Sequence, residues 1–179
     1  MPDGTSQGTA MLHFDPTDDN HRMFRDALGR FSSGVTIVTA NTPEGPVGMT
    51  ANSFTSVSME PPLVLWCPAK SSSRYALFVD ATDFAIHVLE AEQKELALAF
   101  ARSGTAFDSV DTARSDRGVP VFDSCLARFE CETYGFHDAG DHSIMVGLVR
   151  HAAFRQGAPL IFSQGTFGQF DKEVEKANV

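Results

Sequence analysis

The stretch that decides the fold is GMTANSFTSVS, which covers residues 48–58. Within it, residues 50–58 are strand-like, yet they are dense in small hydrogen-bonding side chains. Buried amides and hydroxyls need partners, and a flat heterocycle rich in N–H and C=O groups, such as an isoalloxazine, can supply them. An edge strand with one solvated face is the alternative interpretation of the same pattern.

Short strands are predicted on both sides of this stretch. Residues 35–40 are β-branched, and the apolar run 63–67 predicts a strand buried on both faces. Residues 126–136 alternate between apolar and polar, which is typical of a half-buried antiparallel strand. Further strands are predicted at residues 84–89, 144–149 and 160–162.

Helices are few in this sequence. Apolar spacing predicts one over residues 21–31, ended by Gly34, and another over residues 91–102. A short one ends at Val79, and residues 103–124 are predicted to be a long polar loop. Short strands in succession with few helices favour a mainly β, antiparallel barrel or sandwich over a doubly wound sheet.

Length and charge narrow the possible functions. The 179 residues predict a single domain over residues 21–170, between a flexible N-terminal tail, 1–20, and a C-terminal tail, 171–179. The net charge is −9 and we find no basic patch, which argues against nucleic-acid binding. No apolar run is long enough for a membrane span, and the polar, acidic start does not resemble a secretory signal.

The three cysteines, Cys67, Cys125 and Cys131, are an odd and low count, which favours a reducing cytoplasm over a disulfide framework. Cys67 and Cys131 lie in apolar strands and are predicted to be buried thiols. No cysteine or histidine pair has the spacing of a zinc site, so no metal is predicted.

The segment Lys70-Ser71-Ser72-Ser73-Arg74 is the best candidate for phosphate binding. It places three hydroxyls at a predicted helix start, between two cations, and such a helix start favours an anion. A solvated, serine-rich helix cap is the alternative. The sequence has no Walker loop and no Gly-x-Gly-x-x-Gly after a strand.

Two histidines are expected to have different roles. His142 follows a predicted turn, residues 137–142, and could stack on or bond to a ring ligand. A surface histidine beside Asp141 is the alternative. His87 lies on a predicted buried strand and is expected to be a satisfied core residue. A hydrolase is disfavoured because no Gly-x-Ser-x-Gly elbow is present.

Together these segments resemble the short-chain flavin reductase family over roughly residues 21–170. Residues 33–39, SGVTIVT, resemble its opening strand, and residues 48–58 with 61–65 resemble its most distinctive stretch. Later pieces follow in the family's order: residues 84–89, 100–101, 126–131, 140–142, Gly147 and Val149, and 159–162.

The resemblance implies an FMN-binding split β-barrel with Greek-key-like connections, usually a homodimer with flavin near the subunit interface. It implies hydride transfer from NADH or NADPH to FMN or FAD. The reduced flavin then commonly diffuses to a separate monooxygenase. By position, the isoalloxazine would be lined by Thr50, Ala51, Asn52, Ser53 and Phe54. The phosphate would be held by Lys70, Ser71, Ser72 and Ser73. Phe100 would lie near the flavin, and His142 and Phe167 would face the nicotinamide.

Three positions depart from the family's pattern. The chain has Ala106-Phe107 where Arg-Phe is frequent, His87 where Asn is common, and Phe167 where Tyr is common. The first and third bear on nicotinamide binding and leave the flavin site mostly intact. Two alternatives therefore stay open: a flavoprotein that retains its flavin and reduces another acceptor, and a non-catalytic flavin-binding protein.

Overall fold

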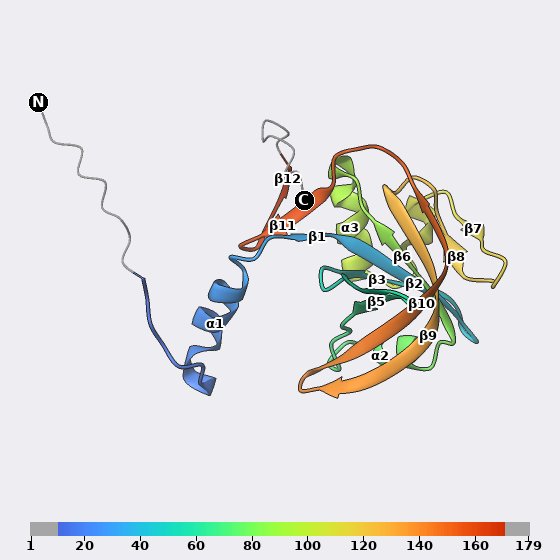
Figure 1. The fold of residues 1–179 in the computed structure, drawn as a ribbon. Helices are drawn as coiled ribbons and strands as arrows, with labels where there is room; N and C mark the ends of the chain where they lie inside the picture. The colour runs from blue at the N-terminus through green and yellow to red at the C-terminus, as the bar shows by residue number, and fades with distance from the viewer. Residues whose placement is uncertain (1–10, 171–179) are drawn as a thin grey trace, which may run out of the picture.

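The structure is a computed structural model that describes residues 11–170 of the chain. Antiparallel strands form most of its regular secondary structure, and the helices are short and lie at its periphery (Figure 1). The predicted tail 171–179 and residues 1–10 of the other predicted tail lie outside the described residues. Within residues 11–170, every helix is too short or too polar to cross a membrane.

The helical segments are η1 (Asp18–Asn20), α1 (His21–Leu28), α2 (Tyr75–Val79), η2 (Ala91–Gln93), α3 (Lys94–Arg102) and η3 (Ala106–Ser109). The strands of the first half are β1 (Ser33–Gly34), β2 (Thr36–Thr42), β3 (Gly45–Ala51), β4 (Thr55–Met59), β5 (Pro62–Trp66) and β6 (Asp83–Val88). Those of the second half are β7 (Ala113–Arg114), β8 (Pro120–Val121), β9 (Ala127–Ala139), β10 (His142–Phe154), β11 (Leu160–Ser163) and β12 (Thr166–Gln169).

The main sheet has seven strands in the order β3-β2-β6-β9-β10-β5-β4. Its two edge strands, β3 and β4, are consecutive in the chain and are joined by residues 52–54. A flat sheet of seven strands would be roughly 29 Å wide, whereas the four residue steps from Ala51 to Thr55 span at most about 14 Å. The sheet must therefore curl until its two edges approach each other at residues 52–54.

Two smaller sheets complete the fold. One has the order β1-β11-β12, and the other pairs β7 with β8. The sequence patterns did not predict the two-residue strands β1, β7 and β8, which are too short to show a period. They also missed β12, whose Thr-Phe-Gly-Gln sequence lacks the continuous apolar run that predicted β11.

The core forms two main clusters of buried residues. One lies inside the curled sheet and contains Trp66, Phe78 and Phe84. The other lies between the sheet and α3 and contains Ile37, Leu89 and Phe100. The prediction that the strand at residues 63–67 is buried on both faces is wrong. Val64 and Trp66 are buried, while Leu63 and Leu65 are half-buried, because the core covers one face of β5.

Several predicted boundaries change. The first helix ends at Leu28, three residues early, because the N–H groups of Arg30 and Phe31 donate only three residues back, to the carbonyls of Ala27 and Leu28 at 3.1 Å, in tight turns that do not continue the α-helix. Gly34 lies in β1 instead of ending that helix. The predicted turn at residues 137–142 narrows to Gly140-Asp141, because β9 continues to Ala139 and Gly140 adopts a φ of +71°.

The predicted loop at residues 103–124 is more ordered than expected. It contains η3, β7 and β8, and Val119, Val121 and Phe122 at its end are buried. Thr39 of β2 donates a 2.6 Å hydrogen bond to the Pro120 carbonyl, which fixes this end against the main sheet. Cys67 is only half-buried, unlike the prediction, because it follows the last residue of β5; Cys131 is buried as predicted.

His87 is a satisfied core residue, as predicted. It is fully buried, its Nδ1 lies 3.1 Å from the Ile37 carbonyl, and its Nε2 accepts from the Phe122 N–H. Its ring stacks on the Phe122 ring with centroids 3.9 Å apart. Burial lowers the pKa of His87 to about 3, so the imidazole is neutral near pH 7.

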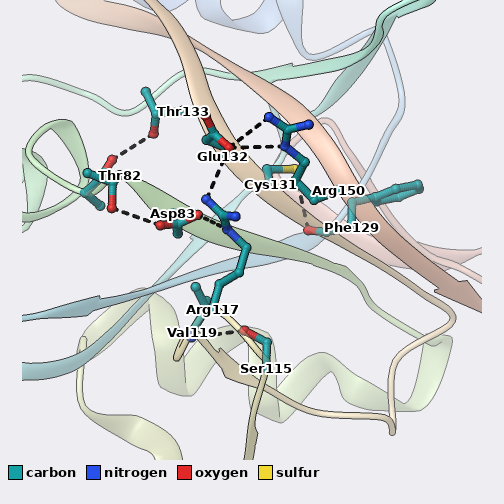
Figure 2. Close-up of polar contacts among 11 residues, drawn as sticks. Thr82, Asp83, Ser115, Arg117, Val119, Phe129, Cys131, Glu132, Thr133 and Arg150 are labelled. Atoms are coloured by element: carbon teal, nitrogen blue, oxygen red, sulfur yellow. Dashed lines mark hydrogen bonds and ion pairs between the residues drawn. The ribbon is translucent and has the colours of Figure 1, made fainter.

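An ion-pair network covers the outer face of β6, β9 and β10 (Figure 2). Arg117 pairs with Asp83, and its NH2 lies 3.2 Å from Glu132 Oε2. Arg150 donates to the same Glu132 oxygen from two nitrogens, at 3.1 and 3.0 Å. The hydrogen bond from Arg117 to Asp83 raises the pKa of Arg117. This outer-face network joins the segment after β7 to the sheet.

Candidate functional site

Three polar segments that are distant in sequence lie together beside the meeting edges of the main sheet. Ser53 Oγ accepts the Cys67 N–H at 2.9 Å, which joins the first segment to the chain leading to Lys70. Ala69 forms a β-bridge with His142, and the Lys70 N–H donates to the Asp141 carbonyl at 2.9 Å. The structure thus brings residues 50–54, 70–73 and 140–142 to one region.

Residues 50–54 are held by contacts on both sides of Asn52. Thr50 Oγ1 donates to the Ala97 carbonyl of α3 at 2.6 Å. The Phe54 ring stacks on Phe129 with centroids 5.4 Å apart. Asn52 itself is exposed, while Thr50, Ala51, Ser53 and Phe54 are half-buried. The amide of Asn52 is therefore presented to solvent from an anchored backbone.

In the predicted phosphate segment, Lys70 is partly engaged. Its Nζ lies 2.5 Å from Asp138 Oδ2 and 2.6 Å from the Gly140 carbonyl, at the tip of the β9–β10 hairpin. The hydrogen bond from Lys70 holds the pKa of Asp138 below its usual value. An ammonium has three N–H donors, so one remains for a ligand.

The three serines of this segment have different environments. Ser71 and Ser73 are exposed. Ser72 is half-buried, and its Oγ accepts the Arg74 N–H at 3.3 Å, so it caps the turn before α2. The exposed hydroxyls of Ser71 and Ser73 are the better placed of the three to meet an anion.

Arg74 does not flank an anion site as the sequence suggested. Its NH1 donates to the Gly48 carbonyl at 3.0 Å and to the Phe100 carbonyl at 2.6 Å. Its NH2 donates to the Ala101 carbonyl at 3.0 Å. The guanidinium is half-buried among these carbonyls, and burial lowers its pKa.

His142 is the first residue of β10 and is half-buried. Its Nδ1 lies 2.8 Å from Asp141 Oδ1, and this contact holds the pKa of Asp141 below its usual value. The next residue, Ser143, is fully buried, and its Oγ lies 2.6 Å from the Tyr75 hydroxyl of α2. The imidazole is thus oriented by the preceding carboxylate and supported by the strand behind it.

Two aromatic rings from the sequence prediction are not among the exposed groups of this region. Phe100 is 0% exposed and packs edge-on against Phe107, so its ring offers no surface to a ligand in this chain. The helical period that placed Phe100 on an apolar face could not distinguish a core ring from a ligand-facing one. Phe167 lies on β12, beside Phe162 and Lys94. In Figure 1, β12 and the tip of the β9–β10 hairpin lie at opposite ends of the molecule.

Sequence reasoning missed Asp138, Tyr75 and Ser143, which shape the site without a motif of their own. Asp138 was assigned to a turn, because the alternation ends at Phe136 and His137 and Asp138 are both polar, whereas β9 continues to Ala139. Tyr75 and Ser143 meet only through the tertiary fold, so no local pattern could have paired them.

The assembled region offers hydroxyls, one amide, one ammonium donor and one imidazole on a fixed frame. Such groups can hydrogen-bond the polar edge of a flat ring and, some residues away, an anionic substituent. A flavin mononucleotide has both features, so the residues present fit the predicted ligand.

Comparison with known proteins agrees with this chemistry. The family described as a flavin reductase like domain matches residues 28–171. The chain is 59% identical over 160 residues to the FMN reductase (NADH) SmoA of Agrobacterium fabrum, covering 89% of this chain and 92% of that protein.

Two further similarities extend this result. The chain is 44% identical over 148 residues to the reductase component of a flavin-dependent trigonelline monooxygenase of Acinetobacter baylyi. That match covers 82% of this chain and 48% of the relative, so the chain spans about half of that longer protein. The solved structure of the NADH:FAD oxidoreductase SgcE6 of Streptomyces globisporus, with NAD and FAD fragments, matches with a TM-score of 0.85 and 37% identity. It covers 93% of this chain and 100% of that one.

Proposed function

This chain belongs to the flavin reductase-like domain family, and from that premise we propose how it works as an NAD(P)H:flavin oxidoreductase. It reduces FMN or FAD with NADH or NADPH, and the reduced flavin serves a separate monooxygenase component. The observation that carries the proposal is the convergence of residues 50–54, 70–73 and 140–142 beside the meeting edges of the sheet.

We assign the ring of the flavin to residues 50–54. The anchors on Thr50, Ser53 and Phe54 fix the backbone there, so the Asn52 amide can meet the polar edge of the isoalloxazine without a further cost of ordering the backbone. Flavin, when bound, supplies the acceptor for the hydride, and the protein supplies position and electrostatics.

We assign the phosphate to Ser71 and Ser73 with the remaining donor of Lys70. Ser72 contributes by holding the turn that presents its two neighbours. His142 is assigned to the nicotinamide side. Phe167 belongs to the same side only if a second copy brings it there, because β12 lies far from the hairpin tip within one chain (Figure 1).

The fold that we propose is a split β-barrel with Greek-key-like connections. The curled seven-stranded sheet supports it, since its edges β3 and β4 meet at residues 52–54. Non-consecutive neighbours such as β2 beside β6 and β10 beside β5 support the Greek-key-like order. The domain is placed at residues 21–170.

We propose that the chain forms a homodimer. Val57 and Met59 on edge strand β4 are 49% and 88% exposed, and Tyr134 and Phe136 of β9 are also exposed. Helix α1 has no buried residue, so a second copy is the occupant that would cover these apolar side chains. Sedimentation analysis should give twice the chain mass of 19.4 kDa; a monomer at micromolar concentration would contradict the assignment.

A cytoplasmic location is proposed on the state of the cysteines. Cys67, Cys125 and Cys131 are all free thiols in the structure. Burial raises the pKa of Cys125 to about 11 and that of Cys131 to about 12, so these thiols are unreactive. Cell fractionation of the native protein tests this location.

The function is tested by adding NADH or NADPH to purified protein with FMN or FAD in excess over enzyme. Many turnovers that scale with free flavin are expected of a reductase that supplies reduced flavin to a partner. Turnover by a tightly held flavin with ping-pong kinetics would instead support a retained cofactor. Flavin binding without oxidation of either nucleotide would contradict the reductase and support a flavin-binding protein.

A further inference from the structure

Arg74 lies between two segments of the candidate site and links them a second time, in addition to the hydrogen bond between Ser53 and Cys67. It directly follows Ser73, at the start of α2. Its guanidinium reaches the carbonyls of Gly48, Phe100 and Ala101 at 3.0, 2.6 and 3.0 Å. Gly48 is two residues before Thr50 on β3. One side chain therefore connects the phosphate segment to the strand that leads into the ring segment.

The acceptors of Arg74 include carbonyls that a helix leaves open. Phe100 and Ala101 lie in the last turn of α3, which ends at Arg102. The last four carbonyls of a helix lack partners within it, and the negative end of the helix dipole favours a cation there. The planar guanidinium presents several N–H donors in a fixed geometry, so it can serve β3 and α3 at once.

The stem of Arg74 is enclosed as well as its head. A Cβ placed on Gly104 would lie 2.8 Å from Arg74 Cδ, so glycine is what lets the two chains approach. The Gly104 carbonyl in turn accepts the Gly48 N–H at 2.8 Å. The end of α3, the middle of β3 and the start of α2 are thus packed around this one side chain.

We propose that Arg74 is a positioning residue that fixes residues 50–54 relative to Ser71 and Ser73, so that both segments meet one flavin together. It acts through the backbone of Gly48 and of the last turn of α3, whose carbonyls accept from both terminal nitrogens of its guanidinium. This inference rests on the proposed function, because it uses the flavin assignments made there.

The proposal makes a distinctive prediction about affinity. If Arg74 keeps the site in its binding-competent arrangement, its loss lowers the competent fraction, and the apparent Kd rises by that factor for every flavin that uses residues 50–54. Riboflavin, FMN and FAD should then weaken equally. A direct ion pair with phosphate would instead spare riboflavin, which has no phosphate.

The test compares Arg74→Ala, Arg74→Lys and the matched control Arg102→Ala. Arg102 is exposed and is the last residue of α3, the helix whose carbonyls Arg74 binds. Its replacement removes the same charge without removing a contact to the candidate site. The Kd values of riboflavin, FMN and FAD are measured well below each variant's Tm. Losing about two net hydrogen bonds of ordinary strength predicts an equal loss of about 10-fold or more for all three flavins in Arg74→Ala. Arg74→Lys should recover part of it, and Arg102→Ala should match wild type.

Other outcomes overturn the inference. A loss for FMN and FAD with riboflavin spared would make Arg74 a phosphate ligand. A lowered Tm with unchanged Kd values would make it a purely structural residue. If Arg74→Ala does not fold, the same comparison among flavins is made with Arg74→Lys. Wild type that binds flavins but turns over neither nucleotide would contradict the proposed function and leave the Arg74 result interpretable.

Discussion

The candidate site and the outer-face network of Figure 2 are both rich in polar side chains, but they use them differently. In the network, Arg117 and Arg150 are both paired with Glu132, and Arg117 is also paired with Asp83. Each of these charged side chains therefore has a partner of opposite charge within the protein. In the site, side-chain hydrogen bonds hold the backbone of residues 50–54, while Asn52, Ser71 and Ser73 remain exposed.

The difference shows which polar cluster to regard as functional. Exposed ion pairs contribute little to stability and need no ligand to explain them. Exposed hydrogen-bonding groups on a backbone that is held from behind are ready for a partner, because the cost of ordering that backbone has been met during folding. The site is thus distinguished by the freedom of its side chains and the rigidity of their support, more than by its charge.

The largest effect on this comparison is expected from the double change Ser71→Ala and Ser73→Ala. Loss of two hydroxyl contacts to a dianionic phosphate should weaken FMN binding by about 2 kcal/mol, or about 30-fold, and leave riboflavin unchanged. Titrations by flavin fluorescence check this. Ser109→Ala, at an exposed position in η3, is the control. Equal losses for riboflavin and FMN would remove the phosphate assignment.

Asn52→Ala should have the next largest effect. Its amide is the exposed group of the ring segment, so its loss should weaken riboflavin, FMN and FAD alike by about 10-fold. The matched control is Asn41→Ala, because the Asn41 amide accepts from Arg114 at 2.5 Å, away from the site. If Asn52→Ala bound flavins with wild-type affinity, the assignment of the flavin ring to residues 50–54 would be wrong.

His142→Ala is expected to act on the dinucleotide more than on the flavin. Removal of one hydrogen bond or stacking contact should raise the KM for NADH about 5-fold. Steady-state kinetics at saturating FMN measure it, and His151→Ala, at an exposed position of β10, is the control. An unchanged KM for NADH would support the alternative interpretation, in which His142 is a surface residue that only pairs with Asp141.

Glu132→Gln should give the smallest effect and the clearest contrast. The carboxylate and its arginine partners are substantially exposed, so the free energy of unfolding should fall by about 1 kcal/mol or less. Urea unfolding measures this, and flavin affinity should match wild type. A loss of flavin binding in this variant would show that the network and the site are coupled, which would break the comparison.

Much of the fold followed from local patterns. Alternation in residues 126–136 predicted β9, apolar spacing over 91–102 predicted η2 with α3, and the buried strand at 84–89 predicted both β6 and a core role for His87. These predictions succeeded because each feature repeats over several residues. The two-residue strands and the end of α1 were not predicted correctly, because one or two contacts decide each of them.

The sequence by itself determined the mainly β class, the family and the three polar segments, because residue type and spacing carry that information along the chain. The tertiary structure alone decided that the segments converge, that Phe100 is a core ring and that Arg74 binds backbone carbonyls of β3 and α3. A long side chain beside several possible acceptors has no direction until the fold sets their positions. The curl that brings the edges β3 and β4 to residues 52–54 is what sets them here.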